Sequence, residues 1–247
     1  MNETTGRWSW NRQIFGGIFS AIKGSYGSLV TTGAALNDKH NGALGIFDTP
    51  SGAWDVAARI AGATAVSLRA DPGLPVQSLP IIGMAAPPIA SRFDVNERNT
   101  LLNNGISTFH VGNDGTCSID SLITFYQFNA AGAPDTSYLY VDDLYKVTYI
   151  LRTLRDLVQI KYARCKLAIN GTRIDPGSNT VTPNMIRLDL IANYKTLVEQ
   201  GVAQNDTLFA ANLIVEINAN NPNRVDVLYP TTLMGGIRGF AVLAQLN

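Results

Sequence analysis

The chain has 247 residues, of which 46% are hydrophobic and only 15% are charged, and its 19 basic and 19 acidic side chains give a formal net charge of zero. Nucleic-acid binding relies on clustered Lys and Arg that displace counterions, so this composition argues against a nucleic-acid partner, while weak mutual repulsion favours self-association. No apolar run reaches the roughly 20 residues of a membrane span, and the first residues show no export signal, so we expect a soluble cytosolic product with no membrane partner.

The first part of the chain alternates short apolar runs with helical stretches. Helical spacing predicts helices at residues 26–36 and 51–69. Strands are predicted at residues 13–20, 42–47, 80–84 and 106–111. This alternation is typical of a mainly parallel sheet with helical cover, and we therefore expect residues 1–113 to form an α/β domain.

The helix at residues 51–69 has the clearest local signals in this part. Thr49 is expected to cap it, and Pro50, whose fixed φ angle suits a helix, is expected to be its first helical residue. Its inner face is predicted from helical spacing to consist of Trp54, Ala57, Ala58, Ala61, Ala65 and Leu68. The prolines between residues 70 and 91 then predict a loop around one short strand.

A turn signal at residues 113–116 begins the second part, residues 114–234, which we predict to be an α+β C-terminal domain. A strand is expected at residues 119–128 and a long helix at residues 138–165. The helix should bury a seam of Leu144, Val147, Leu151, Leu154 and Val158, with Asp142, Lys146, Arg155, Asp156 and Gln159 away from it. Arg152 and Asp156 are four residues apart and can pair.

A second helix in this part is predicted to start at Thr182-Pro183 and to end before Gly201, a natural residue for a helix C-terminus. The residues expected to face inward are Ile186, Leu190, Tyr194 and Leu197.

Three apolar runs at residues 213–217, 224–228 and 237–246 are predicted to be strands. The first two should form a hairpin in which Val215 faces Val227 and Ile217 faces Val225. The last run, with residues 235–247 forming a terminal strand arm after a Gly235-Gly236 hinge, presents an unpaired backbone ladder. Such a strand completes either its own sheet or the sheet of another subunit by strand addition.

No group of residues in the sequence calls for catalysis, a cofactor or a metal. His40, expected in a surface loop, and His110, in an apolar strand, lack the local spacing of metal ligands. Cys117 and Cys165 are expected to be reduced, partly buried thiols. Asp142 and Asp143 face different directions on a helix and are interpreted as a solvated helix start. The basic residues near the end of that helix are interpreted as a solvated or inter-subunit face, and they are Arg152, Arg155, Lys161, Arg164 and Lys166.

The glycine-rich stretch around Gly24 leaves a second class of function open. Its spacing matches neither phosphate-binding motif, so a tight strand-to-helix connection is the preferred interpretation. The competing hypothesis is a cytosolic nucleotide- or cofactor-binding α/β enzyme that uses this turn.

Two stretches, Asn96–Thr108 and Asn212–Leu228, resemble the tail sheath protein of Mu-type contractile bacteriophages. The order of the predicted elements is also similar, and the resemblance is strong from Asp94 to Asn247 and looser before it. The resemblance implies a non-enzymatic, prophage-encoded structural subunit. Related injection devices, the type VI secretion sheath and the phage-tail-like bacteriocin, share this architecture and remain alternatives.

Sheath subunits of this family stack as hexameric rings around the tail tube, and the lattice contracts to drive the tube through the host envelope for genome ejection. The implied partners are neighbouring copies of the chain, the tail tube protein, and baseplate and tail terminator proteins, with no small-molecule substrate. The implied location is the virion tail, after assembly in the bacterial cytoplasm. Family members are longer at the N-terminus, so we expect Met1 to mark a truncated chain or an internal start, with the N-terminal arm missing.

In this family, terminal arms are shared with neighbouring subunits as added strands. On this chain, the resemblance therefore implies a subunit interface made by the last strand and the hairpin. The expected interface residues are Ile237, Phe240, Val242, Leu243, Ala244, Leu246, Val215 and Val227.

Overall fold

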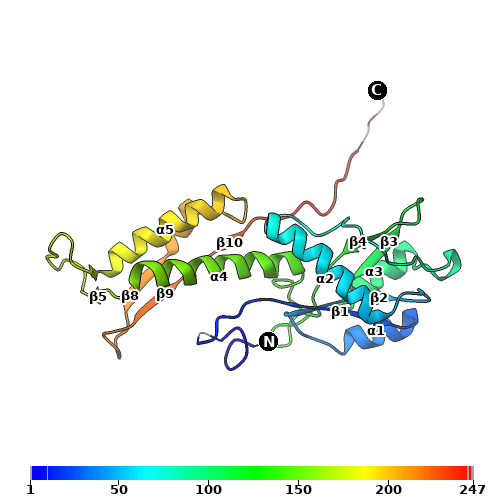
Figure 1. The fold of residues 1–247 in the computed structure, drawn as a ribbon, viewed down its shortest axis with the longest axis horizontal. Helices are drawn as coiled ribbons and strands as arrows, with labels where there is room; N and C mark the ends of the chain where they lie inside the picture. Colours follow the sequence, from blue (N-terminus) through cyan, green and yellow to red (C-terminus); the bar gives the residue numbers. More distant parts are fainter. Residues whose placement is uncertain (1, 10, 244, 246–247) are drawn as a thin grey trace. The chain divides into compact units, whose positions relative to one another are not determined.

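A computed structural model describes residues 2–9, 11–243 and 245 (Figure 1). The chain has a mixed α/β fold and divides into two compact units, one made of residues 1–148 and 236–247 and the other of residues 149–235. This division does not coincide with the predicted boundary near residue 113. Residues after that boundary, including Cys117, Ile119 and Leu122, belong to the same hydrophobic core as the strand and helix before it.

The first unit begins with a β-α-β arrangement. Strands β1 (Ile18–Lys23) and β2 (Asn41–Ile46) are parallel, with Ile18 beside Asn41 and Lys23 beside Ile46, and helix α1 (Tyr26–Ala34) connects them. Strands β3 (Thr108–Val111) and β4 (Cys117–Ser121) are antiparallel, and a parallel bridge joins Leu44 to Ser107. A mainly parallel sheet was predicted, whereas the strands pair as one parallel pair, β1 with β2, and one antiparallel pair, β3 with β4.

Three of the predicted strands in this unit are wrong in extent. The one predicted at residues 119–128 is observed as β4, which ends at Ser121, followed only by isolated bridges at Ile123 and Phe128. The chain enters β1 only at Ile18, because Trp8 Nε1 donates to the Gly16 carbonyl at 2.9 Å and Gln13 has a positive φ of 51°. The predicted strand at residues 80–84 is reduced to a single bridge between Pro80 and Ser118. Proline has no N–H group to donate to a ladder, which explains the short pairing.

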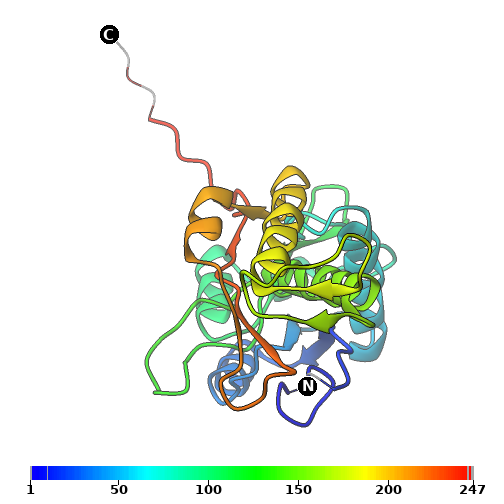
Figure 2. The same ribbon diagram turned by 90° about the vertical axis from the view of Figure 1, so that its left-hand side faces the viewer.

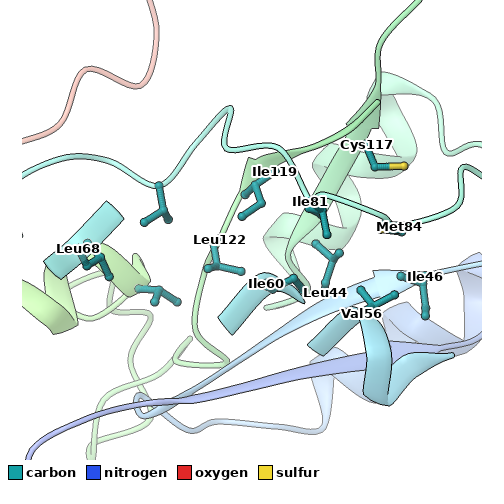
Figure 3. Packing of buried hydrophobic residues seen from close by; sticks show 12 residues of the cluster. Leu44, Ile46, Val56, Ile60, Leu68, Ile81, Met84, Cys117, Ile119 and Leu122 are labelled. Carbon is teal, nitrogen blue, oxygen red and sulfur yellow. The ribbon is translucent and has the colours of Figure 1, made fainter. Parts of the chain in front are cut away.

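Of the predicted inner face of helix α2 (Ala53–Ala70), only Leu68 is buried. Val56, Ile60, Thr64 and Leu68 are buried at four-residue spacing, whereas Trp54 is 81% exposed. Branched aliphatic side chains bury more apolar area than alanines, so they take the inner face. Figure 3 shows Val56 and Ile60 directed toward residues of β2 and β4 in this core.

The start of α2 also differs from the prediction. Gly52 precedes the first helical residue, and Thr49 does not cap the helix but donates its hydroxyl to the Ala85 carbonyl at 2.6 Å. The following proline-rich segment leads to a 3₁₀ turn (Ile89–Ser91) and to helix α3 (Val95–Asn103). A reciprocal capping box between Asp94 and Glu97 opens α3.

Helix α4 (Val141–Tyr162) contains the division between the two units. The predicted seam is only partly correct: Leu144 is buried in the first unit, but Val158 is half exposed. Ile150, outside the predicted seam, is buried in the core of the second unit. Partners distant in the sequence decide which face each half of the helix buries.

The second unit is built around helix α5 (Pro183–Glu199). Thr182 caps it by accepting from the Met185 N–H, and Gly201 has a left-handed φ of 69° after its end, as predicted. The four predicted inward residues, Ile186, Leu190, Tyr194 and Leu197, are all buried. The Tyr194 ring stacks on Phe209 of helix α6 (Asp206–Asn212), with ring centroids 3.7 Å apart.

The strands of the second unit form three small sheets. Two pairs are only two residues long, β5 (Lys166–Leu167) with β6 (Thr180–Val181) and β7 (Ala203–Gln204) with β10 (Thr232–Leu233). The third is an antiparallel pair of β8 (Ile214–Ile217) and β9 (Val225–Leu228).

Candidate subunit interface

The hairpin β8–β9 forms in the predicted register. Val215 faces Val227, and Ile217 faces Val225. Its connection is closed by asparagine: the Asn218 N–H donates to the Arg224 carbonyl at 2.9 Å, and the Asn218 side chain donates to Asp226 at 2.6 Å. Asparagine side chains that bond the local backbone favour turns, so the sequence of this loop determines the pairing.

One part of the hairpin packs on its unit, and another part is open. Val215 and Val225 pack against the core of the second unit. Ile214, Val227 and Leu228 are 49%, 43% and 59% exposed. Within the described residues the sheet has only these two strands, so the outer edge of each has no ladder partner. An open edge with exposed apolar side chains is a template for strand addition.

The terminal arm contains no β-ladder within the described residues, although its sequence predicts a strand. Residues 237–243 belong to no strand, and Figures 1 and 2 show the end of the described chain, in red, running outward from its unit. Ile237, Phe240, Val242 and Leu243 are 75%, 89%, 75% and 94% exposed. Of the other predicted interface residues, Ala244 and Leu246 lie outside the described part of the chain.

The base of the arm, in contrast, is held in the first unit. Arg238 Nη2 donates to Asp142 Oδ2 at 2.5 Å, and its guanidinium lies 3.8 Å from the centre of the Tyr140 ring. The Ile237 carbonyl accepts from Gln77 Nε2 at 2.8 Å. The described chain therefore changes at Arg238 from an anchored segment to an exposed one.

The prediction of a solvated helix start is wrong for Asp142, which is fully buried. Lys146, which was predicted to lie away from the buried seam, is fully buried as well. Lys146 Nζ lies 3.6 Å from Asp142 Oδ2 and 2.8 Å from Asp143 Oδ1. The four-residue spacing of Asp142 and Lys146 was a visible signal for this pair. Arg238 was missed because it lies 96 residues further along the chain from Asp142.

His40 is buried, which corrects its predicted place in a surface loop. Its Nε2 lies 3.1 Å from Glu3 Oε1, and Trp8 packs on its ring with centroids 4.6 Å apart. Burial lowers the pKa of His40, and the neighbouring Glu3 carboxylate opposes part of that shift. These contacts give His40 a structural role, whereas His110 is exposed on β3.

The basic end of α4 pairs partly within the second unit. Lys161 contacts Asp189 at 2.7 Å, and Asp156 pairs with Arg155 at 3.0 Å. Arg164 and Lys166 are exposed. This surface of the second unit retains positive charge.

The remaining candidates from the sequence are the turn at Gly24 and the two cysteines. Gly24 and Ser25 form the tight connection between β1 and α1, as predicted. Cys117 is buried and Cys165 half-buried, both as free thiols. The described residues contain no cluster of His, Cys, Asp and Glu that could hold a metal, and no helix among them has the length and apolarity to cross a membrane.

Comparison with known proteins supports the sequence resemblance. The chain is 37% identical over 239 residues to the Mu-like prophage FluMu tail sheath protein of Haemophilus influenzae (strain Rd), a match covering 97% of the chain. The match covers 49% of that protein, so the chain spans about half the length of this curated relative. No protein-family model matches the chain.

Solved structures show the same fold at low sequence identity. The crystal structure of a sheath tail protein from Desulfitobacterium hafniense aligns with a TM-score of 0.60 and 13% identity, over 88% of this chain and 46% of that one. A chain in the baseplate of the anti-feeding prophage aligns with a TM-score of 0.57 and 10% identity, over 92% of this chain and 60% of that one. The sequence and the fold thus both relate this chain to phage tail sheath proteins.

Proposed function

We propose that this chain is a structural subunit of a contractile tail sheath and that it joins neighbouring copies by donating its terminal arm as a β-strand. The proposal rests on two features of the same chain, an exposed segment that can act as a strand and a sheet edge that can accept one. An exposed apolar segment, residues 239–243, has no strand partner, and the hairpin β8–β9 has open edges. The similarity to a tail sheath protein supports an assembly in which the segment of one copy pairs with the sheet edge of another.

Strand donation suits a lattice whose subunits must move without separating. Main-chain hydrogen bonds along an added strand supply affinity, and alternate side chains supply specificity. Phe240 and Val242 share one face of an extended arm, with Leu243 on the other. Burial of these exposed side chains in a neighbour contributes about 25 cal/mol per Å² of apolar surface.

The remaining properties of the proposed assembly follow the family. The subunits form hexameric rings around a tail tube in the virion, meet baseplate and tail terminator proteins at the ends, and contract to eject the genome through the envelope. The energy for contraction comes from better contacts between subunits in the contracted lattice, and the chain performs no catalysis. Assembly takes place in the cytoplasm of the bacterial host.

Deletion of residues 239–247 tests the donor side of the proposal. We expect the shortened chain to keep the wild-type melting temperature but to sediment as a monomer, because the deleted residues that are described make no ladder in their own unit. Negative-stain electron microscopy and sedimentation velocity at high concentration measure the result. Assemblies of wild-type length and abundance from the deleted chain would refute strand donation.

Leu228→Lys tests the acceptor side. A lysine on an open edge strand opposes the addition of another strand, and Leu228 is already 59% exposed, so its replacement should change stability by no more than about 0.5 kcal/mol. We expect fewer assemblies from this variant. Val66→Lys, at a 74% exposed site in the other unit, is a matched control for added surface charge.

A further inference from the structure

The arm is attached to its own unit by three neighbouring residues at its base. Gly236 lies so close to Pro75 that a Cβ atom on it would be 2.5 Å from Pro75 Cγ. The Ile237 carbonyl accepts from Gln77, and Arg238 contacts Asp142 and the Tyr140 ring. Beyond Arg238, the described part of the arm makes no hydrogen bond or ion pair within the chain.

The contact between Arg238 and Asp142 is the strongest of these attachments. Asp142 is fully buried, and a buried carboxylate is costly unless charged partners compensate for its lost hydration. Arg238 supplies the nearer partner at 2.5 Å, and Lys146 lies further away at 3.6 Å. Withdrawal of Arg238 would leave the carboxylate under-compensated, so the arm is held at this residue.

From this geometry we infer that Arg238 is the positioning residue of strand donation and that the buried Asp142 carboxylate holds its guanidinium in place. This inference rests on the proposed function. Residues up to Arg238 stay with the parent subunit, and only residues from Gly239 onward enter a neighbour. Gly239 has no side chain and tolerates a wide range of backbone angles, so the donated strand changes direction at this residue.

The anchor also limits which surface can accept the arm. An extended chain spans about 3.3 to 3.6 Å per residue, and Leu243 is five residues beyond Arg238, so the apolar segment reaches about 17 Å. The acceptor edge of a neighbouring copy must therefore come within that distance of Arg238. An unanchored arm hinged at Gly235-Gly236 would reach further and would select its acceptor less strictly.

Cleavage by trypsin at Arg238 tests the anchor without requiring assembly. Trypsin must draw the arginine side chain into its own pocket, so a guanidinium held by Asp142 is protected, even in an exposed segment. We expect cleavage after Arg238 in the monomeric protein to be at least about tenfold slower than cleavage after Arg173, an exposed loop arginine of the same chain. Equal rates at the two sites would overturn the anchor. Mass spectrometry of timed digests gives both rates from one sample.

Asp142→Asn and Asp143→Asn form a matched pair for the same measurement. Asp142→Asn should remove the protection of Arg238, while Asp143→Asn should preserve it, because the Asp143 carboxylate contacts Lys146 and not Arg238. Circular dichroism establishes that each variant is folded. Should Asp142→Asn fail to fold, the wild-type ratio of the two cleavage rates still decides the question.

Assembly of the same variants separates this inference from the proposed function. We expect Asp142→Asn to assemble several-fold less than the wild type although its arm sequence is intact. Normal assembly of an Asp142→Asn chain whose Arg238 is freely cleaved would overturn the positioning role and leave strand donation intact. Normal assembly after deletion of residues 239–247 would instead refute donation, whatever the digestion shows.

Discussion

The hairpin β8–β9 and the terminal arm are both apolar segments with strand-forming sequences, yet only the hairpin is paired. The hairpin has a partner a few residues away, a turn closed by Asn218, and a core against which Val215 packs. The arm follows two glycines, has no turn to return it, and remains exposed after Arg238. A segment with strand propensity therefore forms a strand only where another backbone segment is close enough to pair with it.

The largest expected contrast comes from matched phenylalanine replacements. Phe209→Ala removes a fully buried ring that stacks on Tyr194 in the core supporting the hairpin, and it should lower the free energy of unfolding by about 3 to 5 kcal/mol. Phe240→Ala, in the arm, should change it by less than about 0.5 kcal/mol, because Phe240 is 89% exposed. Urea titration followed by circular dichroism measures both. Comparable losses would mean that the arm packs in the free monomer.

A smaller effect is expected from the turn that closes the hairpin. Asn218→Ala removes the side-chain hydrogen bonds to Asp226 and to the Asn220 N–H and should cost about 1 to 2 kcal/mol of stability. Hydrogen exchange should show faster opening of β8 and β9 than of α5. Asn223→Ala is the control, because the Asn223 side chain makes no hydrogen bond in the described structure. Equal effects of the two replacements would show that the turn does not depend on Asn218.

The smallest effect concerns pH and the second unit. Partial burial raises the pKa of Asp189, but hydrogen bonds from Lys161 and Tyr162 outweigh burial and leave this pKa below its ordinary value. A lowered carboxyl pKa adds stability above the ordinary value, and this stability is lost as the pH falls through the folded-state pKa. The wild type should therefore be more stable than Asp189→Asn near pH 6 and should lose this advantage near pH 2. The difference near pH 6 should be less than about 1 kcal/mol, because the pair of Lys161 and Asp189 is partly exposed to solvent. Melting temperatures across this range measure the difference, and a constant difference would exclude the proposed linkage.

Local sequence determined the elements whose partners are close along the chain. The Thr182-Pro183 start and Gly201 end of α5 follow from capping rules, and its buried face follows from helical spacing. The hairpin register follows from five residues of turn between two apolar runs. The likeness to a tail sheath protein was also visible in the sequence, in the stretches around Asn96 and Asn212.

Tertiary structure alone decided the features that depend on distant residues. Nothing in the local sequence distinguishes Asp142 from a solvated aspartate at a helix start. It is buried because Arg238 and the surrounding core cover it. The alanine-rich face of α2 was as regular as the observed face, but the larger side chains Val56 and Ile60 fill the space against the strands. Short-range rules describe what a segment can form, whereas burial and pairing depend on which groups the whole chain brings together.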